Sequence, residues 1–152
     1  MKKVLIVLVA AVMLFSVAKA NAQQMGVYGE YLGSAAAGFG GGVQFGMVKV
    51  GAHYFQYFFV SGISIGGGVN VPVAKIMDNK IDLGIDAQLH YVLGLLVPAW
   101  SIPAGVTFEY KVDNKMSIYG GGGVDINNID GLLTLSPIGA RFLVQAGVKY
   151  AL

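Results

Sequence analysis

The side chains best suited to chemistry are two histidines, His53 and His90, and the hydroxyl and carboxyl groups that the fold would bring near them. A short connection across residues 95–96 would set His90 opposite Ser101, with Asp86 on the same face. A nucleophile, a base and an acid within reach of one another are the components of nucleophilic catalysis. No catalytic motif surrounds either histidine, however, and a polar pair is ordinary on an inward face, so we predict that the chain is not an enzyme.

The same histidines do not predict a metal site. They lie on different predicted strands, and no carboxylates accompany them with the spacing of metal ligands. We therefore expect neither a metal nor another cofactor.

The charged residues predict a second kind of chemistry, an internal network of ion pairs. Arg141 is the only arginine, and its planar guanidinium can hold two carboxylates at once. We predict that it pairs with some of Glu30, Asp86 and Glu109. Such a network would either fill the interior of the protein or, if its pairs rearrange, form a gated path for ions. The residues predicted to share this network are Glu30, Asp82, Asp86, Glu109, Arg141, Lys80 and Lys111.

Strict alternation over residues 80–93 indicates the element that positions these groups. Ile81, Leu83 and Ile85 begin an apolar series at odd positions, whereas Asp82 and Asp86 belong to a polar series at even positions. Successive side chains of a strand point to opposite faces. The segment therefore predicts a strand with one apolar face and one charged face.

Two similar turn sequences divide the chain into hairpins. Met-Asp-Asn-Lys at 77–80 and Val-Asp-Asn-Lys at 112–115 lie 35 residues apart, the length of a hairpin with two strands of about 10 residues and its turns. Without a 22-residue leader the chain has 152 − 22 = 130 residues, and 130/35 is 3.7, or about four hairpins. We predict an all-β fold, an eight-stranded antiparallel up-and-down transmembrane β-barrel, with a tight turn around Val48 and Lys49. The predicted strands are 25–33, 38–47, 50–59, 62–73, 80–93, 99–112, 115–124 and 138–152.

The third of these strands has no clear inner face. Residues 53–59 carry aromatic side chains at both odd and even positions. Either a bulge changes the phase of the strand, or Phe55 and Tyr57 fill the interior. The pattern is compatible with both interpretations.

The N-terminus predicts export. Lys2 and Lys3 precede an apolar run at 4–17, and small residues follow it, so we expect a signal peptide over 1–22 that is cleaved after Ala20 or Ala22 and a barrel domain over 23–152. Cleavage after Ala22 removes three lysines and leaves 10 − 3 = 7 basic residues against 8 acidic ones, a net charge of −1. No basic patch for nucleic acid remains.

Composition favours a membrane barrel over a soluble protein. The 15 charged residues among these 130 are few for a water-exposed surface. Beyond the leader no apolar run reaches 18 residues, so no helix is expected to span a bilayer. A closed barrel is the remaining way for an exported, apolar chain to satisfy its backbone in lipid.

The direction of the apolar face has two possible readings. In soluble barrels of lipocalin type it points inward to a ligand, whereas in membrane barrels it points to lipid. The polar face of strand 62–73 is mostly glycine and serine, which suits a crowded interior better than a solvent surface. Aromatic residues near strand ends predict interface girdles, formed by Tyr57, Phe58, Tyr91, Trp100, Tyr110 and Tyr150.

The C-terminus carries the pattern of an assembly signal. Val148, Tyr150 and Leu152 alternate with polar residues up to the end. This resembles the C-terminal β-signal of bacterial outer-membrane proteins, from which it departs in ending on leucine rather than an aromatic residue. The chain as a whole resembles small eight-stranded bacterial outer-membrane barrels of the OmpX or OmpA membrane-domain type.

This resemblance implies a monomer in the outer membrane, with outer-membrane lipids and the barrel-assembly machinery as partners. It also implies a side-chain-filled lumen and a structural role in envelope integrity. A narrow low-conductance pore and a lipid A-modifying barrel enzyme are the alternatives; the short connections between strands make an adhesin a weak one. The Gly-Gly-Gly-Val repeats at 40–43, 66–69 and 121–124 are expected to make room for Tyr119, Arg141 and inward aromatic residues.

Overall fold

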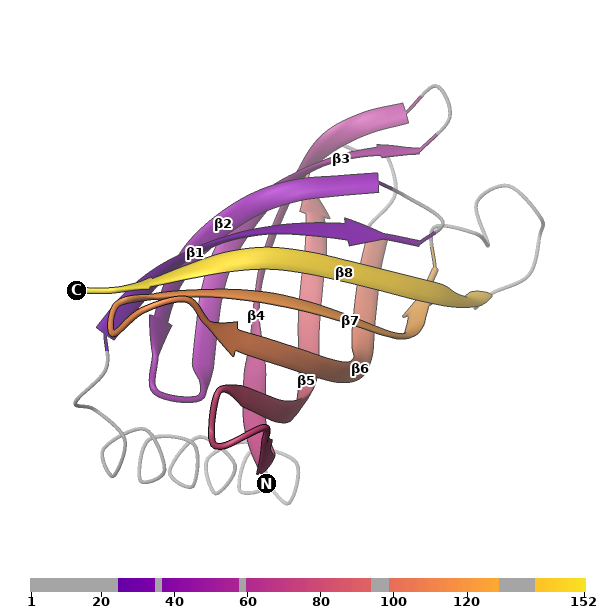
Figure 1. Cartoon of the computed structure of the whole chain (residues 1–152). Coiled ribbons are helices and arrows are strands. Elements are labelled where there is room, and N and C mark those ends of the chain that lie inside the picture. The colour runs from indigo at the N-terminus through magenta and orange to yellow at the C-terminus, as the bar shows by residue number, and fades with distance from the viewer. Residues whose placement is uncertain (1–24, 35–36, 58–59, 94–98, 129–138) are drawn as a thin grey trace, which may run out of the picture.

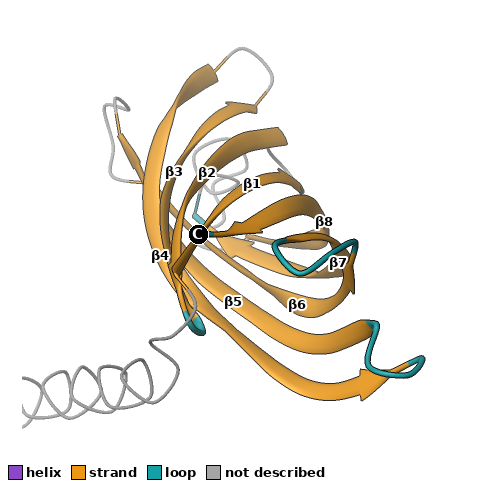
Figure 2. Cartoon of the chain, turned by 60° about the vertical axis from the view of Figure 1, so that its left-hand side comes forward, coloured by secondary structure: helices purple, strands orange, loops and turns teal. Residues whose placement is uncertain are grey.

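The computed structural model describes residues 25–34, 37–57, 60–93, 99–128 and 139–152. They form eight strands in chain order, and each strand pairs antiparallel with its neighbours in sequence (Figure 1). The first strand also pairs with the last, which closes the sheet into the barrel of Figure 2. The predicted fold is therefore confirmed. The strands are β1 (Met25–Gly33), β2 (Ala37–Phe45), β3 (Val48–Tyr57), β4 (Val60–Ile76), β5 (Ile81–Leu93), β6 (Ala99–Lys111), β7 (Met116–Asn127) and β8 (Gly139–Ala151).

The predicted leader, residues 1–22, lies outside the described residues. Within the described part of the chain, no helix is long and apolar enough to cross a membrane.

Tight turns gather at one end of the barrel, here called the turn end. It includes the turn at Gly46 and the turns at 77–80 and 112–115, together with Met25 and Leu152, whose backbone N–H donates to the Met25 carbonyl at 3.0 Å. Met77, Asp78 and Asn79 have φ of 51°, 53° and 65°. The opposite end, which includes Gly33, Asn127 and Gly139, is here called the loop end.

Asp113 holds the turn between β6 and β7 through its own carboxylate. The backbone N–H groups of Lys115 and Met116 each donate to Asp113 Oδ1 at 2.7 Å. These two hydrogen bonds favour the charged form and keep the pKa of the Asp113 carboxyl below its ordinary value. The Asp-Asn-Lys sequence thus forms a side-chain-stabilised turn, as its composition predicts.

The apolar series of each strand points outward. Ile85, Leu89 and Tyr91 of β5 are 52%, 56% and 46% exposed, whereas Asp86 and His90 of the same strand are buried. The pairing of β3 with β4 continues from Val48 to Tyr57 without a shift, so no bulge changes the phase of the third strand. Phe55 is buried in the interior, and the side chain of Tyr57 lies outside the described residues.

A bulge occurs instead in β4, where the sequence analysis expects none. The register of β4 against β5 shifts between Pro72 and Ala74. Proline has no N–H to donate to a ladder, which makes such positions natural places for a bulge. Pairing resumes beyond the bulge, and β4 continues to Ile76, past the predicted end at residue 73.

Candidate functional site: a buried ion-pair network between two cavities

Lys49, the second residue of β3, is the centre of the interior. Its side chain is completely buried, and its Nζ lies 2.8 Å from Asp86 Oδ2 and 3.3 Å from Glu30 Oε2. The carboxylates come from β5 and β1, so three strands converge on one ammonium group. A buried charge of this kind is tolerated because it is paired and hydrogen-bonded.

Two tyrosines enclose the same ammonium group. Lys49 Nζ lies 5.2 Å from the ring centroid of Tyr28 and 4.9 Å from that of Tyr119, close enough for cation–π attraction. The Tyr119 hydroxyl donates to Glu30 Oε2 at 2.6 Å. Tyr119 finds its space over Gly147 of β8, which belongs to none of the Gly-Gly-Gly-Val repeats that were expected to provide it.

Asp86 is held by amide groups on its remaining sides. Asn70 Nδ2 donates to Asp86 Oδ2 at 3.1 Å, and Gln88 Nε2 donates to Asp86 Oδ1 at 2.8 Å. Asn70 Nδ2 also donates to Thr107 Oγ1 at 3.2 Å. These contacts extend the network from β1 across to β6 and fill the cross-section of the barrel, as expected for an eight-stranded lumen.

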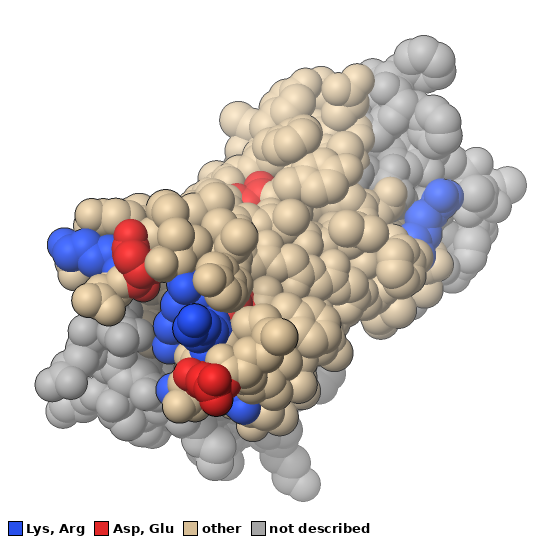
Figure 3. Space-filling view, in the orientation of Figure 1, with Lys and Arg blue, Asp and Glu red and all other residues tan. Residues whose placement is uncertain are grey.

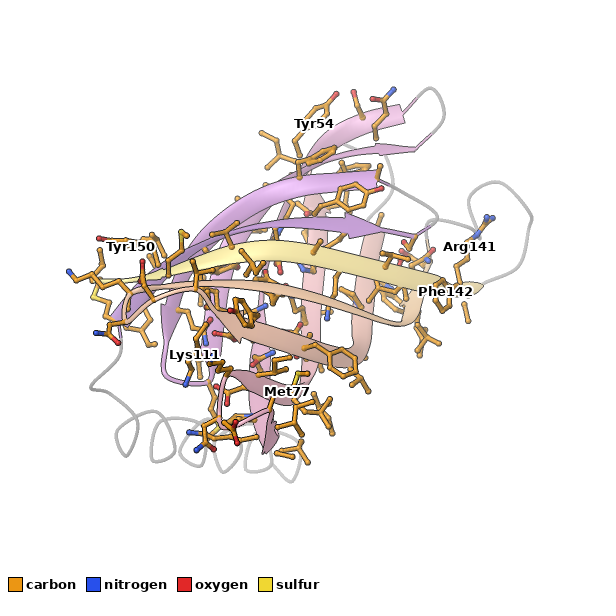
Figure 4. The ribbon with its side chains drawn as sticks, in the orientation of Figure 1. Tyr54, Met77, Lys111, Arg141, Phe142 and Tyr150 are labelled. Carbon is orange, nitrogen blue, oxygen red and sulfur yellow. The ribbon has the colours of Figure 1, made fainter. Side chains whose placement is uncertain are left out.

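The predicted place of Arg141 in this network is wrong. Arg141 lies exposed at the loop end, opposite Asp125 in the register of β7 and β8 (Figure 4). Gly147 is the β8 residue level with Glu30, and Arg141 lies six positions before it along the strand, a distance of about 20 Å. An arginine side chain cannot cover that distance, and Lys49 holds the central position instead.

Lys49 was not predicted as an inward residue, because a tight turn was expected around Val48 and Lys49. The structure places the turn at Gly46, whose φ of 58° suits glycine, and β3 begins at Val48. Counting from this turn puts Lys49, His53 and Phe55 on one face. The glycine at position 46, between two strand-like segments, is the sequence feature that could have located the turn correctly and so predicted Lys49 to point inward.

The other predicted lumen charges lie at the turn end, around an open cavity of about 810 Å³. Lys111 Nζ lies 3.2 Å from Asp82 Oδ2, and the Lys111 side chain is 46% exposed. Glu109 accepts hydrogen bonds from Lys149 Nζ and, at 2.6 Å, from the Ser117 hydroxyl. Figure 3 shows basic and acidic side chains gathered at the end of the molecule that carries the C-terminus.

Lys80 is not part of the inner strand face. It lies exposed in the turn that precedes β5, and its backbone N–H donates to the Met77 carbonyl at 3.1 Å. The strand predicted over 80–93 therefore begins at Ile81, one residue later than expected.

A second, small cavity of about 50 Å³ lies on the loop-end side of Lys49. His90 is paired with Ser101 in the register, as predicted. The Ser101 hydroxyl, however, donates to Asp125 Oδ1 at 2.5 Å, and Asp125 also accepts from the Ser34 hydroxyl at 2.6 Å. His90 Nε2 lies 3.0 Å from Gln88 Oε1. Ser101 and His90 therefore hydrogen-bond to other residues, Asp125 and Gln88, and not to each other as nucleophile and base.

Predicted girdle residues occupy both ends of the outer surface. Tyr91 and Trp100 are paired across β5 and β6 near the loop end, whereas Tyr110 and Tyr150 lie near the turn end. Phe58 and the side chain of Tyr57 lie outside the described residues.

The terminal strand β8 presents its predicted signal residues outward. Val148, Tyr150 and Leu152 are 47%, 44% and 67% exposed. The strand also closes the barrel against β1 through the pairs Tyr150–Val27 and Val148–Gly29.

Similarity to known proteins lies in the fold. In sequence, the chain matches no protein-family model and no curated protein. Its structure is similar to one described as a de novo design of transmembrane β-barrels, at 16% identity over 85% of this chain and 95% of the other, with a TM-score of 0.50. The fold is that of a transmembrane β-barrel. The crystal structure of Neisserial surface protein A (NspA) is also similar, at 15% identity, the same coverages and a TM-score of 0.47.

Proposed function

We propose that this protein is a monomeric outer-membrane barrel with a closed lumen and a structural role in envelope integrity. The observation that carries the proposal is the buried network around Lys49, which separates the cavity at the turn end from the small cavity on the loop-end side. Opposite charges that are paired and desolvated hold one another in place. This favours a plug over the alternative of a narrow pore.

Refolded protein in a planar bilayer is expected to show no steady single-channel conductance. The reason is that an ion would have to displace Lys49 from both carboxylates to pass. Insertion is verified separately by the heat-dependent mobility of the refolded barrel on a denaturing gel. A steady conductance from correctly inserted protein would contradict the closed lumen and support the pore.

The outward apolar surface supports a lipid environment. Exposed apolar side chains extend around the barrel, and they include Phe39, Val50, Ile63, Ile85, Leu89, Val106, Phe108, Val124, Phe142 and Val144. In a soluble barrel of lipocalin type the apolar face would point inward. Here the inner face carries Glu30, Lys49 and Asp86.

Leu89→Arg is expected to lower the free energy of unfolding by about 2–4 kcal/mol when the barrel is refolded in lipid bilayers. Leu89 is 56% exposed in the middle part of β5, so an arginine there would be placed in hydrocarbon. Urea titration of the refolded variant measures the loss. Met77→Arg is the matched control, because Met77 is 70% exposed in the turn at 77–80, at the turn end of the barrel. This variant should lower the free energy of unfolding by less than about 1 kcal/mol. Equal, small effects at both positions would contradict a lipid-facing surface.

Assembly and location follow from the same proposal. The outward residues Val148, Tyr150 and Leu152 form the C-terminal signal read by the barrel-assembly machinery, and outer-membrane lipids surround the finished barrel. Among the described residues, the cavity that His90 lines measures only about 50 Å³, which is small for a lipid substrate. This favours a structural role over lipid modification.

A further inference from the structure

We propose that His53 and His90 form a two-histidine site for a monovalent copper ion, Cu⁺, inside the barrel. The rings come from β3 and β5, and their centroids lie 4.7 Å apart in an edge-to-face arrangement. Both side chains are buried, and both line the small loop-end cavity. They are the two histidines of the chain.

Small residues allow the two rings to approach. The strand between them, β4, contributes Ser64 and Gly66 to the interior. A Cβ at Gly66 would lie 2.8 Å from His90 Nδ1, and one at Gly40 would lie 2.4 Å from His53 Cδ2. Any larger residue at these glycines would occupy the space that the imidazoles fill.

Hydrogen bonds define the tautomer of each ring. His53 Nε2 lies 3.0 Å from Glu30 Oε1, and a carboxylate can only accept, so this nitrogen carries the proton. His90 Nε2 lies 3.0 Å from Gln88 Oε1. The Gln88 amide is oriented by its own donation to Asp86 at 2.8 Å, so His90 Nε2 must also be the donor.

Both Nδ1 atoms therefore carry a lone pair. His53 Nδ1 is buried without a hydrogen-bond partner. His90 Nδ1 has only a long contact, 3.5 Å, with Ser64 Oγ. In metal-binding histidines one ring nitrogen typically donates its N–H to a carboxylate or carbonyl oxygen, and the other, unprotonated nitrogen binds the metal. Both imidazoles have this arrangement of donor and lone pair.

The number and charge of the ligands select the ion. Among the described residues, no cluster has three or more His, Cys, Asp or Glu side chains that could hold a metal. Structural zinc sites take four protein ligands, whereas Cu⁺ is stable between two nitrogens, and imidazole suits copper. The neighbouring network has two carboxylates, Glu30 and Asp86, against one ammonium, Lys49. An added positive charge is therefore electrostatically favoured.

Binding requires one ring to turn and the two rings to separate, because in an edge-to-face pair one imidazole presents its face, and not its in-plane lone pair, to the other. Metal–nitrogen bonds of about 2 Å place two coordinated rings farther apart than the 4.7 Å between the present centroids. The cavity of about 50 Å³ beside them provides the space. Cu⁺ binding would therefore be coupled to this rearrangement of the two imidazoles.

The test is a Cu⁺ titration of the refolded full barrel in detergent, under anaerobic reducing conditions and against a chromophoric Cu⁺ chelator. We expect one Cu⁺ per barrel, with two nitrogen donors in X-ray absorption spectra. His90→Gln should weaken binding at least tenfold, and His53→Gln/His90→Gln should abolish it. Ser101→Ala, which alters the same cavity but removes no ligand, should bind as the wild type does. The heat-dependent gel shift verifies the fold of each variant.

Three results would overturn the proposal: no Cu⁺ uptake by folded wild-type protein, uptake unchanged in folded His90→Gln protein, or tighter binding of Zn²⁺ than of Cu⁺ in a parallel titration. If loss of His53 prevents folding because Glu30 loses a partner, the His90→Gln variant alone decides the question. In the wild-type protein the His90 ring contacts the neutral Gln88 rather than a carboxylate, so its removal takes no partner from a buried charge.

Discussion

Lys49→Met is expected to lower the free energy of unfolding by about 3–5 kcal/mol, because removing one member of a buried ion pair leaves the other uncompensated. Two carboxylates, Glu30 and Asp86, lose their shared partner in this variant. Glu30 keeps hydrogen bonds from Tyr119, Gln88 and neutral His53. Asp86 keeps those from Asn70 and Gln88. Neither set supplies a formal positive charge. Urea titration of the refolded barrel measures the change.

Two further variants separate the network from a general effect of losing a lysine. Lys111→Met removes the partner of Asp82, but this pair is partly exposed, so it should cost less than about 1 kcal/mol. The triple variant Lys49→Met/Glu30→Gln/Asp86→Asn removes all three charges together and should recover much of the loss. Equal losses for Lys49→Met and Lys111→Met would show that the central network does not stabilise the barrel.

Gly147→Ala is expected to destabilise the barrel by about 1–3 kcal/mol or more, because it overpacks the interior against the Tyr119 ring. A Cβ at this position would lie 2.5 Å from the Gly29 carbonyl oxygen and 2.5 Å from the Tyr119 ring and hydroxyl. The tyrosine cannot withdraw without losing its hydrogen bond to Glu30. The carbonyl belongs to the neighbouring strand and can move only with the β1–β8 seam.

The matched control for this variant is Gly120→Ala. Gly120 lies next to Tyr119 on β7 but has outward parity, and its nearest neighbour would be 3.8 Å from the added Cβ. We expect a change within about 0.5 kcal/mol. Thermal or urea unfolding of the two refolded variants makes the comparison, and a tolerated Gly147→Ala would contradict the close contact between Tyr119 and β8.

These variants address how a small membrane barrel keeps a charged interior closed. The ammonium of Lys49 is the meeting point of strands that are not neighbours, since β1, β3 and β5 contribute its partners and itself. The network therefore ties opposite parts of the sheet together, in addition to the ladder of backbone hydrogen bonds. This is the physical basis for proposing a structural role.

The sequence alone determined the fold, because alternation reports directly on the two faces of a strand. The face assignment along β5 and the pairing of His90 with Ser101 followed from alternation and a short connection, and both are confirmed. The turns at 77–80 and 112–115 were also recognisable, since Asp and Asn favour such turns, and in the second of them Asp113 accepts two backbone hydrogen bonds.

Only the tertiary structure decided which inward side chains meet. Alternation gives the face of a residue but not its height in the barrel, and the height depends on the register of every strand pair and on the residue at which each turn begins. Because the turn lies at Gly46 and not at Lys49, the inward position of Lys49 was not predicted, and about 20 Å of strand separates Arg141 from the level of Glu30. For the same reason His53 and His90, which the sequence places on separate strands, come into contact only when β3, β4 and β5 assemble around Gly66.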